Sequence, residues 1–111
     1  MISAETLAQA DIELANADAA RATGFEGRAR AGARRAAGLA ARSFLANQGI
    51  PLRLTSAYDI LQILRDRPDT TVEIQEVIDH LLMRVNEDHQ LPIPVDLIAE
   101  TRWLIQTLNK D

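Results

Sequence analysis

The sequence predicts an all-α fold: an antiparallel up-and-down bundle of four main helices plus one short helix, in a single domain over residues 1–111. Apolar residues recur at three- and four-residue steps along most of the chain, which is the spacing of one face of an α-helix. No segment alternates apolar and polar residues with the period of two typical of a half-buried strand. Glycine and proline separate five helical segments with short connections, as in helical bundles.

The first helix is expected over residues 3–23. Ser3 is a favourable N-cap residue, and Glu5 places a negative charge in the first turn, where it complements the helix dipole. The two glycines of "GFEG" (residues 24–27) then make a continuous helix unfavourable. The inner face consists of residues three or four positions apart: Leu7, Ala10, Leu14 and Ala17.

The second helix is expected over residues 28–48, with Gly49 as a left-handed cap at its C-terminal end. Successive residues of a helix are ~100° apart, which gathers small side chains on one side of this helix. An alanine-rich face lets neighbouring backbones approach closely, so we expect this helix at the centre of the bundle. The face consists of Ala29, Ala33, Ala36, Ala37, Ala40 and Phe44.

The third and fourth helices begin with capping signals. Ser56 and Asp59 open the third helix in a pattern similar to a capping box, and Pro68 ends it. The fourth helix begins near Thr70, in "TTVE". The expected buried residues are Ile60, Leu61 and Leu64 in the third helix and Ile74, Val77, Ile78, Leu81, Leu82 and Val85 in the fourth.

The fifth helix is expected to have Pro94 in its first turn and to end near Asn109. Trp103 lies roughly 240° around the helical wheel from Leu97, off the apolar face. Such a tryptophan either anchors an interface between subunits or covers the edge of the monomer core. The inner face consists of Leu97, Ile98, Thr101, Leu104, Ile105 and Leu108.

Composition excludes several classes of site. The chain has no cysteine, which excludes a disulfide, a thiolate zinc site and a cysteine nucleophile. The two histidines, His80 and His89, do not form an H-x-x-x-H pair of metal ligands, and we expect no metal site and no cofactor. The first residues lack the apolar run of a signal peptide, and no apolar stretch approaches the ~20 residues of a membrane span. We therefore expect a cytoplasmic protein without a membrane partner.

The net charge of −4 is unevenly distributed along the chain. Residues 21–53 hold seven arginines and one glutamate, whereas residues 54–111 hold eleven acids and five bases. Arg28, Arg35 and Arg42 are seven positions apart and form a stripe along the second helix. This stripe is a candidate phosphate-binding site; alternatively, its arginines pair with acids of the neighbouring helices.

One pattern spans the second helix: A-x-x-A-A-x-x-A-x-x-x-x-L, followed by a linker that begins with glycine. Its residues here are Ala33, Ala36, Ala37, Ala40, Leu45 and Gly49. The pattern resembles a helix of the HEPN domains, a family of small α-helical bundles. The segments "LAQADIELANAD", "SAYDILQIL" and "DLIAETRWLIQTL" are similar to the first, third and last helices of that family.

The resemblance implies a homodimer and a nucleotide- or nucleic-acid-associated function. Many HEPN proteins are metal-independent ribonucleases, or toxins paired with a nucleotidyltransferase antitoxin, and their signature is an arginine and a histidine separated by four to six residues. Arg84 and His89 are separated by four. In a ribonuclease the histidine takes a proton from the RNA 2′-hydroxyl, and the arginine stabilises the charge on the scissile phosphate. The resemblance thus nominates Arg84 and His89 as the catalytic pair, and RNA or a nucleotidyltransferase-type protein as the partner.

The same residues also fit a non-catalytic helical module that serves dimerisation or acts as an adaptor. In that case Arg84 and His89 are solvated side chains at the end of the fourth helix, where a cation is favourable. Glu87 and Asp88 lie between them in the sequence and repel an incoming phosphate. The two hypotheses differ in geometry, because a ribonuclease requires Arg84 and His89 to line one cleft.

Overall fold

The computed structural model describes residues 1–50, 52–53, 56–84, 91 and 93–110. This part of the chain forms five helices and no strand, which confirms the all-α prediction. The chain is compact, because its Cα radius of gyration of 13.4 Å is close to the ~13 Å expected for a globular chain of this length. The helices are α1 (Ala4–Ala22), α2 (Glu26–Asn47), α3 (Ala57–Arg65), α4 (Val72–Leu82) and α5 (Leu97–Leu108).

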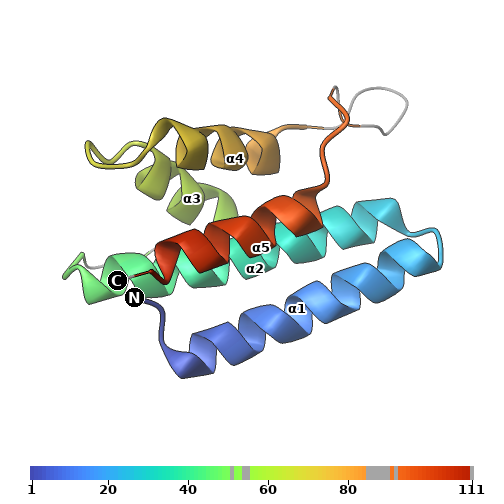
Figure 1. Ribbon diagram of the computed structural model, residues 1–111, viewed down its shortest axis with the longest axis horizontal. Helices are drawn as coiled ribbons and strands as arrows, with labels where there is room; N and C mark the ends of the chain where they lie inside the picture. Colours follow the sequence, from blue (N-terminus) through green and yellow to red (C-terminus); the bar gives the residue numbers. More distant parts are fainter. Residues whose placement is uncertain (51, 54–55, 85–90, 92, 111) are drawn as a thin grey trace.

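Helix α1 is antiparallel to both α2 and α5 (Figure 1). At the start of α1, the Ile2 amide donates a hydrogen bond of 2.9 Å to Asn109 Oδ1, just after α5. The Ser3 amide donates a hydrogen bond of 3.0 Å to Ser43 Oγ in the last turns of α2. The two ends of the chain are therefore close together (Figure 1). Helices α3 and α4 pack on the opposite side of α2 and α5 from α1.

Helix α2 is central and contacts each of the other four helices. Its alanine-rich face is buried as predicted, except that Phe44 is only partly buried. Two glycines allow further close contacts: a Cβ atom at Gly32 would lie 3.1 Å from Ala17 Cβ, and one at Gly38 would lie 2.7 Å from Ala57 Cβ. Small side chains thus set the separation between α2 and its neighbours. The alanines of α2 with 0% exposure are Ala29, Ala33, Ala36, Ala37, Ala40 and Ala41.

Larger aliphatic side chains of the other helices form the rest of the core. The predicted inner faces of α3 and α5 are confirmed, because every residue assigned to them is buried. In α4, Ile74, Ile78 and Leu81 are buried, whereas Val77 and Leu82 are partly buried. Among the described residues, none of the helices combines the length and the apolar character that a membrane span requires.

Most of the predicted helix ends are confirmed. The side chains of Ser3, Ser56 and Thr71 each accept a hydrogen bond from the amide three residues later, as N-caps do. Gly49 adopts a left-handed conformation (φ +79°) after α2, as predicted. Helix α2 begins at Glu26, slightly earlier than predicted, because in the segment "GFEG" only Gly24 takes a positive φ, of +87°.

Helix α4 ends at Leu82, earlier than its apolar stripe predicted. Met83 has extended backbone angles (φ −69°, ψ 137°), so Arg84 lies beyond the helix. Val85, the last residue assigned to the stripe, lies outside the described residues. The apolar stripe correctly predicted which side of α4 is buried. The end of a helix, however, depends on where its backbone hydrogen bonds stop.

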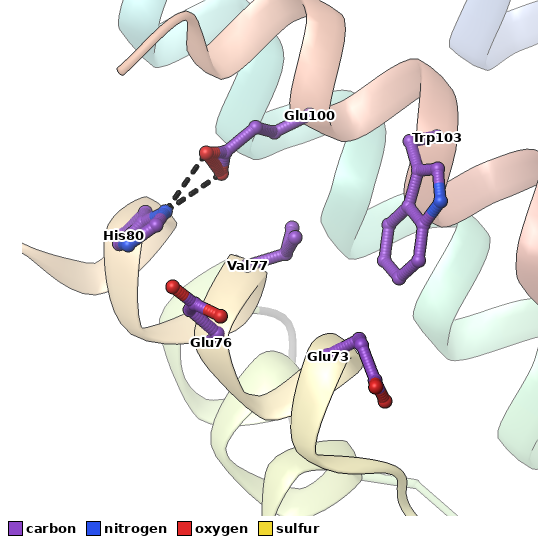
Figure 2. A pocket seen from close by; sticks show the side chains of 6 residues that line it. All are labelled: Glu73, Glu76, Val77, His80, Glu100 and Trp103. Atoms are coloured by element: carbon purple, nitrogen blue, oxygen red, sulfur yellow. Dashed lines mark hydrogen bonds and ion pairs between the residues drawn. The ribbon is translucent and has the colours of Figure 1, made fainter. Parts of the chain in front are cut away.

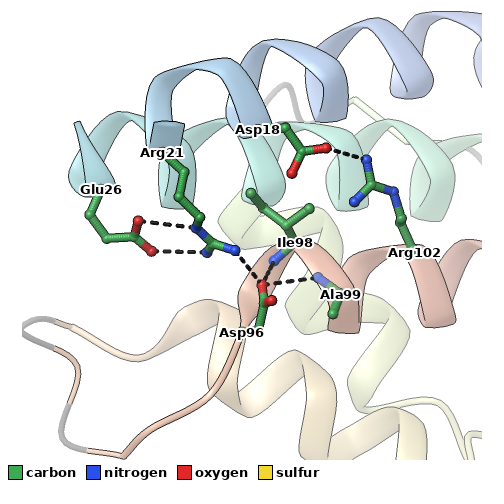
Figure 3. Close-up of polar contacts among 7 residues, drawn as sticks. All are labelled: Asp18, Arg21, Glu26, Asp96, Ile98, Ala99 and Arg102. Carbon is green, nitrogen blue, oxygen red and sulfur yellow. Dashed lines mark hydrogen bonds and ion pairs between the residues drawn. The ribbon is translucent and has the colours of Figure 1, made fainter. Parts of the chain in front are cut away.

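Helix α5 begins at Leu97, so the prediction that Pro94 occupies its first turn is wrong. Asp96 is the N-cap, and its Oδ1 accepts hydrogen bonds of 3.1 Å from the Ile98 amide and 3.2 Å from the Ala99 amide (Figure 3). A carboxylate that accepts hydrogen bonds from two amides favours the start of a helix more strongly than a proline, which only fits the first turn without adding a hydrogen bond.

Arg21 joins the end of α1 to the start of α5 (Figure 3). Its Nη1 donates a hydrogen bond of 2.8 Å to Asp96 Oδ1, and its Nε and Nη2 donate two further bonds to the Glu26 carboxylate. The bonds to Glu26 and Asp96 raise the pKa of Arg21 above its ordinary value. Partial burial alone would raise the pKa of Asp96, but the hydrogen bonds from Arg21 and from the amides of α5 outweigh it and hold this pKa below its ordinary value.

A Gly38→Ala substitution tests the close packing of α2. The new Cβ would lie 2.7 Å from Ala57 Cβ and 3.0 Å from Ala57 Cα, so the backbone of α3 must shift. We expect the free energy of unfolding to fall by about 1–3 kcal/mol in urea denaturation. The control is Gly27→Ala, whose Cβ meets nothing within 4 Å and which gains up to about 1 kcal/mol from helix propensity. Equal stability of the two variants would contradict this packing.

An Asp96→Ala substitution tests the cap of α5. We expect a loss of about 1–2 kcal/mol at pH 7, because two amides and Arg21 lose their acceptor. The pKa of Asp96 is lower in the folded state than in the unfolded state. The ionised carboxylate therefore stabilises the fold above the unfolded pKa of about 4, and this stabilisation is lost as the pH falls below that value. The stability difference between wild type and variant should therefore shrink as the pH falls below about 4.

The control for the Asp96 experiment is Asp18→Ala. Asp18 pairs with Arg102 of α5 at 2.6 Å, but both side chains are about half exposed, so we expect a loss below about 1 kcal/mol. Thermal melts of the three proteins from pH 7 to pH 2.5 measure both effects. A stability difference between wild type and Asp96→Ala that stays constant over this pH range would contradict the lowered pKa of Asp96 in the folded state.

Candidate functional site

Three arginines line one cavity of about 630 Å³ at the end of α4, here named the arginine cavity. Its walls come from α2, from the first turn of α3, from the end of α4 and from the segment that precedes α5. None of the described residues that line it carries a carboxylate. The lining residues are Gly27, Arg30, Arg34, Tyr58, Leu82, Met83, Arg84 and Leu91.

Arg30 and Arg34 lie one turn apart on α2, so both guanidinium groups are on the same side of that helix. Two like charges at this spacing destabilise a helix by about 0.2–0.5 kcal/mol. An anion placed between the two guanidinium groups is attracted by both of them, which makes the arrangement favourable for binding an anion.

Arg34 is held in place by the end of α4. Its Nε donates a hydrogen bond of 2.7 Å to the carbonyl oxygen of Leu81, one of the last carbonyls of that helix. This bond uses neither of the two terminal nitrogens of the guanidinium group. Burial lowers the pKa of Arg34, yet an arginine stays protonated at neutral pH. The cavity therefore contains an oriented and partly desolvated cation.

Arg84 reaches the same cavity because α4 stops two residues before it. Its side chain is exposed, in contrast to the partly buried Arg34. His89, the other half of the predicted catalytic pair, lies outside the described residues, as do Glu87 and Asp88. The pairing of Arg84 with His89 across one cleft stays a prediction.

A second cavity lies between α4 and α5 and has the opposite electrostatic character. This histidine pocket has a volume of about 270 Å³. Figure 2 shows His80 and Glu100 at one end of the pocket and Trp103 at the other. Three of its side chains are glutamates, so the pocket disfavours a phosphate. The lining residues are Glu73, Glu76, Val77, His80, Glu100 and Trp103.

His80 and Glu100 form a hydrogen-bonded pair across this pocket. His80 Nδ1 lies 2.8 Å from both carboxylate oxygens of Glu100 (Figure 2). Because an ionised carboxylate only accepts hydrogen bonds, the ring donates through Nδ1. The two side chains are 15% and 22% exposed, so the pair is largely shielded from water and joins α4 to α5. Its position identifies a structural link between the two helices.

The three arginines of the predicted stripe do not line one common cavity, and phosphate binding by the stripe stays a prediction. Arg35 Nε donates a hydrogen bond of 3.0 Å to Glu13 of α1. Arg35 and Arg42 line a cavity of about 280 Å³ together with that glutamate. Arg28 lies elsewhere, with its guanidinium carbon 4.8 Å from the centre of the Phe25 ring. Arg35 thus forms an ion pair with an acid of a neighbouring helix, which the sequence offered as the alternative to phosphate binding.

Trp103 lies off the inner face of α5, as the helical wheel predicted. Leu97, Leu104 and Leu108 are buried, whereas Trp103 is 39% exposed. Its indole lines the histidine pocket beside Val77 (Figure 2). The side chain thus covers part of the α4–α5 edge and still presents apolar surface to solvent. Its role as a homodimer anchor stays a prediction.

The sequence did not single out Arg30, Arg34 or Tyr58 as one site. The four-residue spacing of the two arginines was a visible signal, since it places them on one side of a helix. Nothing in the sequence indicated that Tyr58, in the capping turn of α3, would reach the same cavity. The contact between His80 and Glu100 had no sequence signal either, because it depends on how α4 and α5 pack.

Comparisons with known proteins add no family to this geometry. Neither a family model, nor a curated protein, nor a solved structure matches the chain. What the site can do therefore follows from its own side chains.

Proposed function

We propose that this chain is a HEPN-like protein that binds the phosphates of RNA in the arginine cavity and cleaves RNA without a metal ion. One observation carries the proposal: Arg30, Arg34 and Arg84 come from two separate parts of the chain to line a cavity whose described walls hold no carboxylate. A guanidinium group presents paired donors that match phosphate oxygens, so three of them around one space favour a phosphate-bearing ligand.

The electrostatics favour this cavity over the rest of the surface. The net charge of −4 repels nucleic acid in general, so binding depends on a local concentration of positive charge. Two unit charges 4 Å apart attract by about 1 kcal/mol in water and by about 4 kcal/mol at the lower effective dielectric near a protein surface. The partly buried Arg34 therefore contributes more to the affinity for a phosphate than the exposed Arg84.

In the proposed reaction His89 is the general base and Arg84 the phosphate clamp. The imidazole takes the proton of the 2′-hydroxyl, whose oxygen attacks the adjacent phosphorus as the bond to the 5′-oxygen breaks. The products are a 2′,3′-cyclic phosphate and a 5′-hydroxyl; the leaving oxygen takes a proton from water, and the imidazolium returns its proton to the solvent. Arg84 stabilises the negative charge that develops on the phosphate oxygens. Support comes from the position of Arg84 in the cavity and from the spacing of four residues to His89. A nucleotidyltransferase-type protein is the proposed protein partner.

The experiment is RNA cleavage in EDTA by wild type, His89→Ala, Arg84→Ala and His80→Ala. We expect the His89 and Arg84 variants to lose about 10²–10⁴-fold in rate. His80→Ala is the matched control, because it removes the other histidine of the chain, which is bound to Glu100 in the histidine pocket. Thermal melts of each variant establish that it is folded. Equal cleavage by wild type and His89→Ala would exclude the proposed mechanism.

The second candidate function is a non-catalytic module for dimerisation or as an adaptor. It is favoured by Trp103, a large apolar side chain that is 39% exposed on α5. Tryptophan is enriched among the residues that dominate the energy of protein interfaces. We propose that Trp103 anchors a homodimer, which is compatible with either function.

Light scattering tests the dimer. We expect the wild-type protein at micromolar concentration to have twice the 12.2 kDa mass of one chain, and Trp103→Ala to shift the mass toward that of one chain. Phe25→Ala is the control, since Phe25 is also exposed, at 52%, but lies against Arg28. A wild-type mass of one chain at every concentration, or an unchanged dimer in Trp103→Ala, would contradict the proposed interface.

A further inference from the structure

Tyr58 lines the arginine cavity although half of its surface is exposed to solvent. It lies in the first turn of α3, whereas Arg34 comes from α2 and Arg84 follows α4. A tyrosine ring is flat and has few rotatable bonds, so it offers a large contact surface at low entropic cost. Bases of unpaired nucleotides stack on such rings. The cavity therefore combines donors for a phosphate with a surface for a base.

The remaining walls suit the apolar parts of a nucleotide. Leu82, Met83 and Leu91 supply aliphatic surface between the charged groups. The volume of about 630 Å³ lies within the ~300–1,000 Å³ typical of small-molecule sites. A lone phosphate ion would leave most of that space and all of the apolar surface unused.

Arg34 is prepared to bind a phosphate before a ligand arrives. The 2.7 Å bond to the Leu81 carbonyl fixes its guanidinium group through Nε. The two terminal nitrogens can then donate to two oxygens of the same phosphate. Because the side chain is already ordered, binding costs less conformational entropy than at a mobile surface arginine.

We infer that the arginine cavity binds one nucleoside monophosphate unit, with its phosphate at Arg34 and Arg84 and its base against the ring of Tyr58. The inference rests on the proposed function and names the ligand unit of that site. A free mononucleotide and a nucleotide within an RNA chain share this chemistry. In either case Tyr58 determines the preference for a phosphate that carries a base.

The test is calorimetric titration of the full chain with AMP, adenosine, inorganic phosphate and a short unpaired oligoadenylate. For wild type we expect AMP to bind at least about tenfold more tightly than phosphate or adenosine. Tyr58→Ala should weaken AMP binding about tenfold or more and leave phosphate binding unchanged, whereas Tyr58→Phe keeps the ring and should keep the affinity for AMP.

Arginine variants measure the phosphate part of the same site. Arg34→Gln should weaken AMP and phosphate alike by about tenfold or more. Arg34→Lys keeps the positive charge but loses the paired donors of the guanidinium group, so this variant should also bind AMP and phosphate more weakly than wild type. Arg102→Ala is the control, since Arg102 pairs with Asp18 of α1, does not line the arginine cavity and should leave both affinities unchanged. Circular dichroism establishes that each variant is folded.

The outcomes separate this inference from the proposed function. If Tyr58→Ala binds AMP as tightly as wild type does, the inference is wrong, while phosphate binding in the cavity stands. If wild type binds neither AMP, nor phosphate, nor the oligonucleotide, both are wrong. Tyr58-dependent binding that is tighter for the oligonucleotide than for AMP supports an RNA chain as the source of the nucleotide, and equal affinities support a free nucleotide.

Discussion

The structure depends on the close approach that small residues of α2 allow. Alanines with no exposed surface and two glycines let α1, α3, α4 and α5 all contact this one helix. Larger side chains there would separate the helices and open the core, because protein interiors tolerate neither voids nor overlap. The same helix carries Arg30 and Arg34, so the packing that stabilises the fold also fixes two of the three cations of the cavity.

Five of the arginines fall into two groups with different environments. Arg21 and Arg35 form ion pairs with carboxylates of this chain, and their charge is largely used within the fold. Arg30, Arg34 and Arg84 gather around a cavity without a carboxylate among its described walls. Glutamates collect instead in the histidine pocket between α4 and α5. The molecule thus separates its charges, and a phosphate has one favourable cavity among those described.

Local patterns predicted the helices and their inner faces well. The buried residues of α3 and α5 follow from the helical period alone, which needs no knowledge of the partner helix. The C-terminal end of α4 was less predictable, since an apolar stripe does not show where the helical backbone stops. The N-terminal start of α5 was also less predictable, because both Pro94 and Asp96 are residues that favour the start of a helix. The cavity could not be predicted, because Arg34 and Tyr58 meet only through the packing of α2 against α3.

The most direct measurement is a crystal structure of the protein soaked with a short RNA or with AMP. Binding in the arginine cavity requires a phosphate oxygen within hydrogen-bond distance, about 2.7–3.1 Å, of the terminal nitrogens of Arg34. A phosphate bound instead beside Arg35 and Arg42, or at Arg28, would contradict the assignment of the site. In that case the separation of charge around α4 would be a feature of folding and not of function.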